Sequence, residues 1–221
     1  MKKGIIIAVI AIAITVGVIA TYYGNQSAIE QSNLDLQRHS GTVNTSMGSP
    51  ILGSVNAPIT IVEFGDYQCP SCDKWFREVR PSIEDNYIKT GKANLVFVDL
   101  AFFGPDSTKA AEASYCANDQ GKYWEFHNLL YSNQRGINDG WANSDSLKGF
   151  ASQLGLDMNL FNTCLDGDKY KERVAHNVQV AQDSGAKGTP TFIIVNSKGE
   201  QQKIDGPQPF SVFKQTLDGM I

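Results

Sequence analysis

The two cysteines of Cys69-Pro70-Ser71-Cys72 have the type and spacing best suited to chemistry in this sequence. They directly follow an apolar run, Ile59–Phe64, and precede a stretch that suits a helix. This layout is typical of a thiol–disulfide exchange site. The first cysteine would lie at the helix N-terminus, where unpaired backbone N–H groups and the helix dipole favour a thiolate, the attacking species. Pro70 suits the first helical turn, because a missing N–H costs nothing there.

The same spacing is also half of a zinc site. Zinc would need two further ligands at suitable spacing. The other cysteines, Cys116 and Cys164, belong to no second C-x-x-C, and the three histidines form no H-x-x-x-H pair. The sequence therefore favours redox chemistry over zinc binding.

Glu63 interrupts an apolar strand whose neighbours should all be buried. Parallel strands are usually buried on both faces, and a buried carboxylate is costly unless it is paired or protonated. The alternative is an edge-strand glutamate that faces water. A buried acid a few residues before Cys72 could accept its proton and activate it for release of substrate. Asp66 is a second candidate for this role, although its loop position suggests exposure to solvent.

Thr189-Pro190 begins another predicted strand, Pro190–Val195. Proline is unusual in a central strand but is allowed at its first residue, and a cis bond is one solution. Gly188 and Thr189 would leave room for a second chain to approach closely. We therefore expect Thr189 and Pro190 to contribute to a substrate-binding site.

Cys116 and Cys164 lie on separate predicted helices, and three interpretations stay open. They could form a structural disulfide, which in an exported chain is the common outcome. They could act as a redox relay with Cys69 and Cys72. They could also be two buried free thiols.

The length of 221 residues and an apolar content of 42% allow one sizeable domain with appendages. Gly4–Tyr23 carries no charge, is rich in Ile, Val and Ala, and follows two lysines. It predicts a retained membrane anchor or, alternatively, a signal peptide, over residues 1–23. Either way the lysines face the cytoplasm and the rest is exported. Residues 24–50 are polar and aperiodic, which predicts a flexible tether before a domain at 51–221.

The charge balance argues against nucleic acid as a partner. Without Lys2 and Lys3 the chain has 17 basic and 23 acidic residues, a net charge of −6, and no Lys/Arg cluster stands out. Nucleic-acid-binding domains usually carry a basic patch.

The pattern of elements predicts an α/β fold with a helical insert. Strands at 58–64 and 93–100 flank a helix at 73–87, which is a βαβ unit with parallel pairing. Pro81 should kink or break that helix. Residues 106–184 are predicted to form a helical insert of four or five helices with no strand. A strand pair at 190–195 and 201–205 and a final helix at 207–220 complete the domain.

The chain resembles the DsbA-like branch of the thioredoxin superfamily, because three features occur in it together. They are Ile61-Val62-Glu63-Phe64 leading to the C-x-x-C, the long helical insert, and Gly188-Thr189-Pro190-Thr191-Phe192. The resemblance covers residues 51–221 and implies a thioredoxin fold interrupted by a helical domain.

The resemblance also implies roles for individual residues. Cys69 would be the exposed nucleophile and Cys72 the buried resolving cysteine. Pro190 would be cis and pack against the disulfide, and Glu63 matches the acidic residue that precedes the motif. The segments around Cys116 and Cys164 resemble the subgroup with an extra cysteine pair in the insert.

One departure concerns Ser71. The best-known oxidising members have histidine before the second cysteine, where it helps to hold the thiolate. With serine there, the sequence leaves open whether the net reaction is oxidation, reduction or isomerisation of disulfides.

These features predict a membrane-anchored, extracytoplasmic thiol–disulfide oxidoreductase that needs neither an organic cofactor nor a metal. The chain would be secreted instead if the N-terminal segment is cleaved. Its substrates would be unfolded or partly folded exported proteins with thiols, bound near Pro70, Ser71 and Thr189. A membrane redox partner would reset the site. A redox-inert, chaperone-like binding module is the alternative from a different class.

Overall fold

The structure is a computed structural model that describes residues 43–221. The predicted anchor and the tether up to residue 42 lie outside these residues. Within residues 43–221, no helix is both long and apolar enough to cross a bilayer. Residues 43–50, which we assigned to the tether, contact the domain: Ser49 N donates to Phe97 O at 2.8 Å, and Arg173 Nε donates to Met47 O at 2.8 Å. The folded part of the chain therefore includes them.

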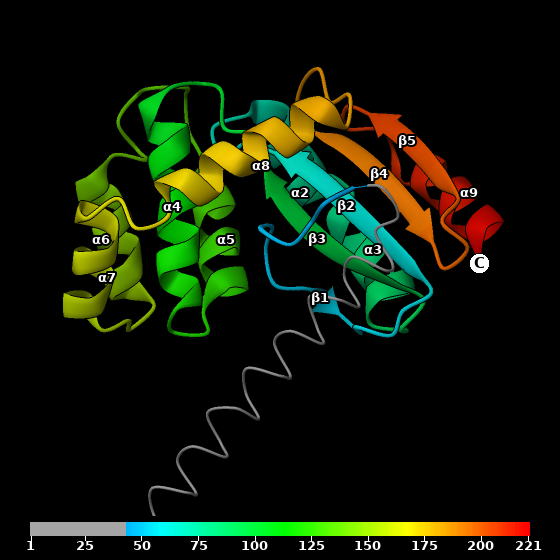
Figure 1. Ribbon diagram of the computed structural model, residues 1–221, viewed down its shortest axis with the longest axis horizontal. Helices are drawn as coiled ribbons and strands as arrows, with labels where there is room; N and C mark the ends of the chain where they lie inside the picture. The colour runs from blue at the N-terminus through cyan, green and yellow to red at the C-terminus, as the bar shows by residue number, and fades with distance from the viewer. Residues whose placement is uncertain (1–42) are drawn as a thin grey trace, which may run out of the picture. The chain divides into compact units, whose positions relative to one another are not determined.

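A five-stranded mixed sheet organises the domain, with strand order β1-β3-β2-β4-β5 (Figure 1). Its strands are β1 (Leu52–Gly53), β2 (Ile59–Gly65), β3 (Ala93–Asp99), β4 (Thr191–Asn196) and β5 (Gln201–Asp205). β2 and β3 pair in parallel, as predicted, whereas β4 runs antiparallel to β2 and to β5. All residues of β2, β3 and β4 are buried, because helices cover the sheet. The short β1, which has no sequence signal, pairs antiparallel with β3.

The helix after the cysteine motif is broken, as Pro81 predicts. It consists of α2 (Pro70–Glu78), α3 (Arg80–Ile83) and a π-helical turn η1 (Glu84–Ile88). Val79 separates the first two, and Pro81 lies in the first turn of α3, where its missing N–H is tolerated.

Between β3 and β4 the chain forms five consecutive helices, which confirms the helical insert. They are α4 (Pro105–Asn118), α5 (Tyr123–Ser132), α6 (Ser144–Gln153), α7 (Met158–Asp166) and α8 (Lys171–Asp183). Helices α4 to α7 form one group, and α8 leads from it back to the sheet (Figure 1). The chain ends with α9 (Phe210–Met220), which packs Phe213 and Leu217 into the core.

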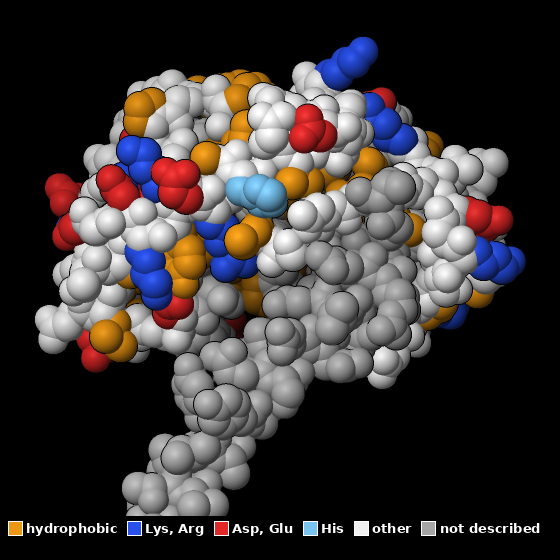
Figure 2. Space-filling model, in the orientation of Figure 1, with side chains coloured by type: hydrophobic (Ala, Val, Ile, Leu, Met, Phe, Trp, Pro, Cys, Tyr) orange, Lys and Arg blue, Asp and Glu red, His pale blue; other side chains and the backbone are white. Residues whose placement is uncertain are grey.

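Two apolar clusters fill the part of the chain that the structure describes, and the cysteine motif lies where the insert meets the sheet. One cluster lies between the sheet, α2, α3 and α9 and includes Trp75, Phe192 and Phe213. The other fills the insert and extends to Cys69 and Cys72. On the face shown in Figure 2, acidic and basic side chains are interspersed.

Candidate redox site

Cys69 occupies the N-cap position of α2, and Pro70 is in the first helical turn, as the sequence predicts. The backbone of Cys69 is extended, with φ −74° and ψ 117°. Its carbonyl accepts hydrogen bonds from Cys72 N and Asp73 N, both at 3.1 Å. The loop thus places the Cys69 side chain at the positive end of the helix dipole.

Both cysteines of the motif are free thiols, and both are almost inaccessible. Cys72 is 0% exposed, as expected. Cys69 is only 3% exposed, so the expectation of an exposed nucleophile is wrong. The reason is tertiary: the loop before β4 lies against the thiol, whose Sγ donates to Thr189 O at 3.3 Å. Pro70 is exposed and Ser71 half-buried, so these two residues are the part of the motif that faces solvent.

The two thiols differ sharply in acidity. The pKa of Cys69 is lowered to about 6, and the hydrogen bond with the Cys72 thiol is the largest cause. The side chain of Thr189 and the backbone N–H groups of Cys72 and Ser71 add to this effect, and partial burial opposes it. Burial raises the pKa of Cys72 well above its usual value, because no solvent stabilises its thiolate. At neutral pH the arrangement favours a thiolate on Cys69 and a protonated Cys72.

Glu63 is buried in β2, with 1% of its surface exposed, and its Oε2 atom has no hydrogen-bond partner. Burial raises its pKa to about 8, an effect that the positive charge of Arg80 partly offsets. The edge-strand alternative is therefore wrong, because β2 is flanked by β3 and β4. An ionised Glu63 would raise the pKa of Cys72 further, so the two groups share one electrostatic environment.

Asp66, the competing acid, is not in solvent as its loop position suggested. It is 1% exposed and fully engaged: its carboxylate accepts from Gln68 N, the Ser107 hydroxyl, and the N–H groups of Phe102 and Phe103. With four donors at its carboxylate, Asp66 stabilises the conformation of the loop after β2. Glu63, with an unpaired oxygen, is better placed to exchange protons.

The bond between Thr189 and Pro190 is cis, as the resemblance implies. Pro190 is buried and Thr189 half-buried. Gly188, Thr189 and Pro190 line a surface hollow together with Lys187 and Lys203. The structure thus brings Thr189, Pro190 and Cys69, which are distant in sequence, to one place.

The second cysteine pair is a disulfide. Cys116 and Cys164 are joined with an S–S distance of 2.00 Å and a Cα–Cα distance of 5.8 Å. The bond links α4 to α7 inside the insert. In residues 43–221 no group of three His, Cys, Asp or Glu side chains is arranged to hold a metal ion.

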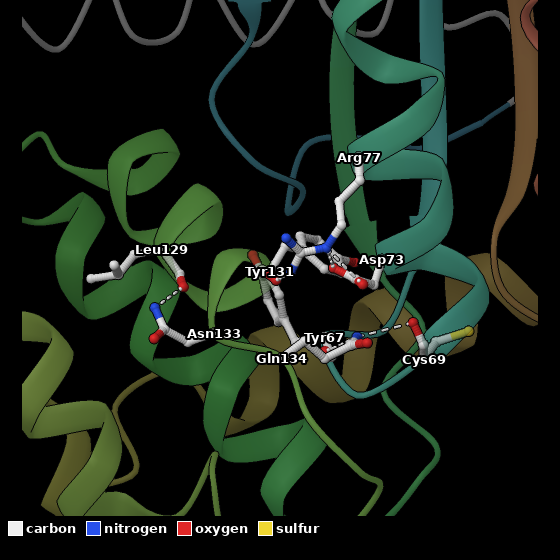
Figure 3. A network of polar contacts seen from close by, with 8 residues as sticks. All are labelled: Tyr67, Cys69, Asp73, Arg77, Leu129, Tyr131, Asn133 and Gln134. Carbon is white, nitrogen blue, oxygen red and sulfur yellow. Dashed lines mark hydrogen bonds and ion pairs between the residues drawn. The ribbon is translucent and has the colours of Figure 1, made fainter.

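No sequence pattern points to the amide side chains that hold the motif. Gln68, fully buried, accepts from Asn138 N at 2.7 Å and donates to the Ser107 hydroxyl at 3.0 Å. Gln134, in the loop after α5, donates to Tyr67 O and Cys69 O (Figure 3). These contacts span large sequence separations and follow no motif, so only the folded structure could identify them.

Comparison with known proteins agrees with this geometry. Residues 45–219 match the family described as Thioredoxin, which is most of the chain. The chain belongs to this family.

Within the thioredoxin family, the chain is similar to proteins that are named for disulfide bond formation. It is 33% identical over 154 residues to disulfide bond formation protein D of Bacillus subtilis, covering 68% of this chain and 69% of that protein. The crystal structure of oxidised BdbD from Bacillus subtilis superposes with a TM-score of 0.74 at 26% identity, covering 82% of this chain and 97% of that one. Wolbachia pipientis α-DsbA1 gives a TM-score of 0.69 at 25% identity, covering 77% of this chain and 89% of that one.

These matches confirm the thioredoxin fold with an inserted helical domain and the resemblance to the DsbA-like branch. The thioredoxin-family chain is thus a thiol–disulfide oxidoreductase.

Proposed function

We propose that the protein forms disulfides in exported protein substrates outside the cytoplasm, through Cys69 as nucleophilic sulfur and Cys72 as resolving sulfur. The observation that carries the proposal is the pKa of about 6 at Cys69, beside a Cys72 whose pKa is raised. A thiolate that is stable at neutral pH is a good leaving group and stabilises the reduced enzyme. That combination favours oxidation of substrates.

In the oxidised enzyme, a substrate thiolate attacks the Cys69 sulfur of the Cys69–Cys72 disulfide. A mixed disulfide forms with Cys69, and Cys72 leaves and takes up a proton. A second substrate thiolate then attacks the substrate sulfur of this mixed disulfide, and Cys69 leaves as a thiolate. Two electrons pass from the substrate dithiol to the enzyme, which a membrane redox partner must reoxidise.

Glu63 is the proposed proton carrier for Cys72. With a pKa of about 8 it is mainly protonated at neutral pH, so it can give a proton to the leaving Cys72 thiolate. During reoxidation the same carboxylate can take a proton from Cys72. Both groups are buried, which excludes bulk water from direct proton exchange.

Thr189, Pro190, Pro70 and Ser71 are the proposed substrate contacts. An extended substrate segment could pair with the backbone beside Thr189, as in strand addition. Cys116–Cys164 is proposed to be structural, because it ties two helices of the insert to each other. Residues 1–23 are proposed to hold the domain at the outer face of the membrane, with residues 24–42 as the tether.

The pKa of Cys69 also bears on the direction of the reaction. A value of about 6 lies between about 7 for thioredoxin and about 3.5 for DsbA. We therefore propose an oxidant of intermediate strength, for which Ser71 in place of histidine is one cause.

The test is catalysis by the full-length chain in detergent micelles. A peptide with two thiols, whose fluorescence changes on ring closure, is oxidised in a glutathione buffer at pH 7, and insulin reduction is measured in parallel. We expect the protein to accelerate oxidation of the peptide, and we expect this acceleration to be absent in Cys69→Ser and in Cys72→Ser. Acceleration of insulin reduction alone would indicate a reductase, and acceleration of neither reaction would indicate a binding module.

A further inference from the structure

The loop between α5 and α6 reaches from the helical insert to the cysteine motif through one side chain. Gln134 Nε2 donates to Tyr67 O at 2.6 Å and to Cys69 O at 3.0 Å. Figure 3 shows the amide of Gln134 lying against the segment from Tyr67 to Cys69, while the sulfur of Cys69 points away from the amide. Gln134 therefore contacts the backbone of the nucleophile without covering its sulfur.

The carbonyl that Gln134 holds is also the carbonyl that begins α2. Cys69 O accepts from Cys72 N and Asp73 N, the first hydrogen bonds of the helix. The next peptide bond leads into Pro70, which has no N–H and so cannot anchor the loop by donating. The orientation of the peptide after Cys69 therefore depends on what binds its oxygen.

The end of α5, directly before this loop, is held to the neighbourhood of the cysteine motif by two further contacts, which limits how far Gln134 can move. Arg77 on α2 donates from Nη2 to Tyr131 O at 2.6 Å, and its Nε is paired with Asp73 at 2.8 Å. The Tyr131 hydroxyl donates to Asp66 O at 3.3 Å. Tyr131, three residues before Gln134, thus ties the end of α5 to the last turn of α2 and to the loop before the cysteine motif. Figure 3 shows the contact between Arg77 and Tyr131 beside Gln134.

We propose that Gln134 is a positioning residue for Cys69: its amide fixes the Cys69 carbonyl and thereby keeps the sulfur at the N-terminus of α2. The proposal rests on the proposed function, in which Cys69 is the nucleophile. It assigns to the helical insert a direct part in setting the reactivity of the thiol.

The chemical consequence follows from which groups stabilise the thiolate. The backbone N–H groups of Ser71 and Cys72 lie just after the carbonyl that Gln134 holds, and both lower the pKa of Cys69. Without Gln134 the carbonyl is held by Cys72 N and Asp73 N alone. A small rotation of the peptide then weakens the alignment of the Ser71 and Cys72 N–H groups with the sulfur. The reduced enzyme then loses stabilisation relative to the oxidised enzyme, and the pair becomes less oxidising.

The experiment compares Gln134→Leu with a matched control, Asn133→Leu, in the full-length chain. Leucine is similar in size to glutamine but cannot donate. Asn133, the neighbouring residue, donates to Leu129 O at 2.8 Å at the end of α5 (Figure 3). Three quantities are measured: the equilibrium constant with glutathione, the pH midpoint of Cys69 alkylation, and the urea midpoint of unfolding.

We expect Gln134→Leu to lower the equilibrium constant for oxidising glutathione by about three- to tenfold, the effect of losing the hydrogen bond to the Cys69 carbonyl. The alkylation midpoint should move upward. Asn133→Leu should change the urea midpoint but neither redox quantity. Equal redox shifts in both variants would show a general loosening of the insert and overturn the proposal.

Gln134→Glu is the second variant, in case leucine prevents folding. Its ionised carboxylate accepts hydrogen bonds only and would face two carbonyl oxygens, so the redox shift should have the same sign and a larger size. If a folded Gln134 variant keeps the wild-type equilibrium constant and the wild-type alkylation midpoint, the inference about Gln134 is overturned but the proposed function is not. A wild-type chain that does not exchange with glutathione through Cys69 would instead overturn the proposed function.

Discussion

The sulfur of Cys69 lies 3.3 Å from the carbonyl oxygen of Thr189, a residue 120 positions later in the chain. This contact joins the nucleophile to the segment that leads into β4. A substrate that pairs with the backbone at Thr189 would therefore have its own sulfur brought close to Cys69. The same contact explains the low exposure of Cys69, so substrate binding at Thr189, as proposed, would be coupled to access to the thiol.

Cys69 should be alkylated much faster than Cys72 in the reduced protein. Only Cys69 has a lowered pKa, and Cys72 is fully buried with a raised pKa. Brief treatment with iodoacetamide at pH 6, followed by peptide mapping, should place nearly all label on Cys69. Preferential labelling of Cys72 would exchange the two proposed roles.

Replacement of Glu63 by Gln should stabilise the protein at pH 8 but have little effect at pH 4. In the folded state Glu63 keeps its proton up to about pH 8. In the unfolded chain the same carboxyl, with the ordinary pKa of 4.5, has lost its proton well below that pH. The folded state thus binds more protons than the unfolded chain within this window, and wild-type stability falls as pH rises through it. Urea unfolding at several pH values measures the difference.

Glu78→Gln is the matched control for that series, because Glu78 is an exposed residue at the end of α2. Its stability should follow the wild-type pH dependence. Parallel curves for wild type and Glu63→Gln would mean that Glu63 is ionised in the folded protein. The proton-carrier role of Glu63 would then be lost.

The double variant Cys116→Ala, Cys164→Ala should be less stable but still active. Closing a loop with a sequence separation of 48 restricts the unfolded chain, and its loss should cost about 4 kcal/mol of unfolding free energy in the chain-entropy model. Thermal unfolding and peptide oxidation measure the two effects. Loss of oxidation by a variant that is still folded would support a redox relay.

Ser71→His should make the protein a stronger oxidant. Ser71 is half-buried in the first turn of α2, so an imidazolium there can stabilise the Cys69 thiolate without full desolvation. We expect the equilibrium constant with glutathione to rise by up to about fivefold, as for a partly exposed charge pair. An unchanged constant would show that another residue sets the potential.

Much of the fold could be predicted because its signals are local. The apolar runs at β2, β3 and β4, and the effect of Pro81 on α2 and α3, depend on residues adjacent in sequence. By contrast, β1 is only two residues long, and it depends on pairing with β3. The packing of residues 43–50 likewise depends on partners such as Phe97 and Arg173, far along the chain.

The site divides in the same way. Cys69, Cys72 and Glu63 were identifiable because their types and spacing are unusual next to a buried strand. The burial of Cys69 depends on Thr189, and the role of Asp66 depends on Ser107, Phe102 and Phe103. No local pattern indicates which distant groups meet in the fold, and a polar residue in a loop gives no sign that its partners will bury it.

The central claim is that the fold stabilises a thiolate on Cys69, and one titration tests it directly. Absorbance at 240 nm of the reduced full-length protein is followed against pH, with Cys69→Ala as the blank. The structure predicts a midpoint at a pH of about 6. A midpoint at or above about 8.5, the value of a free cysteine, would contradict it.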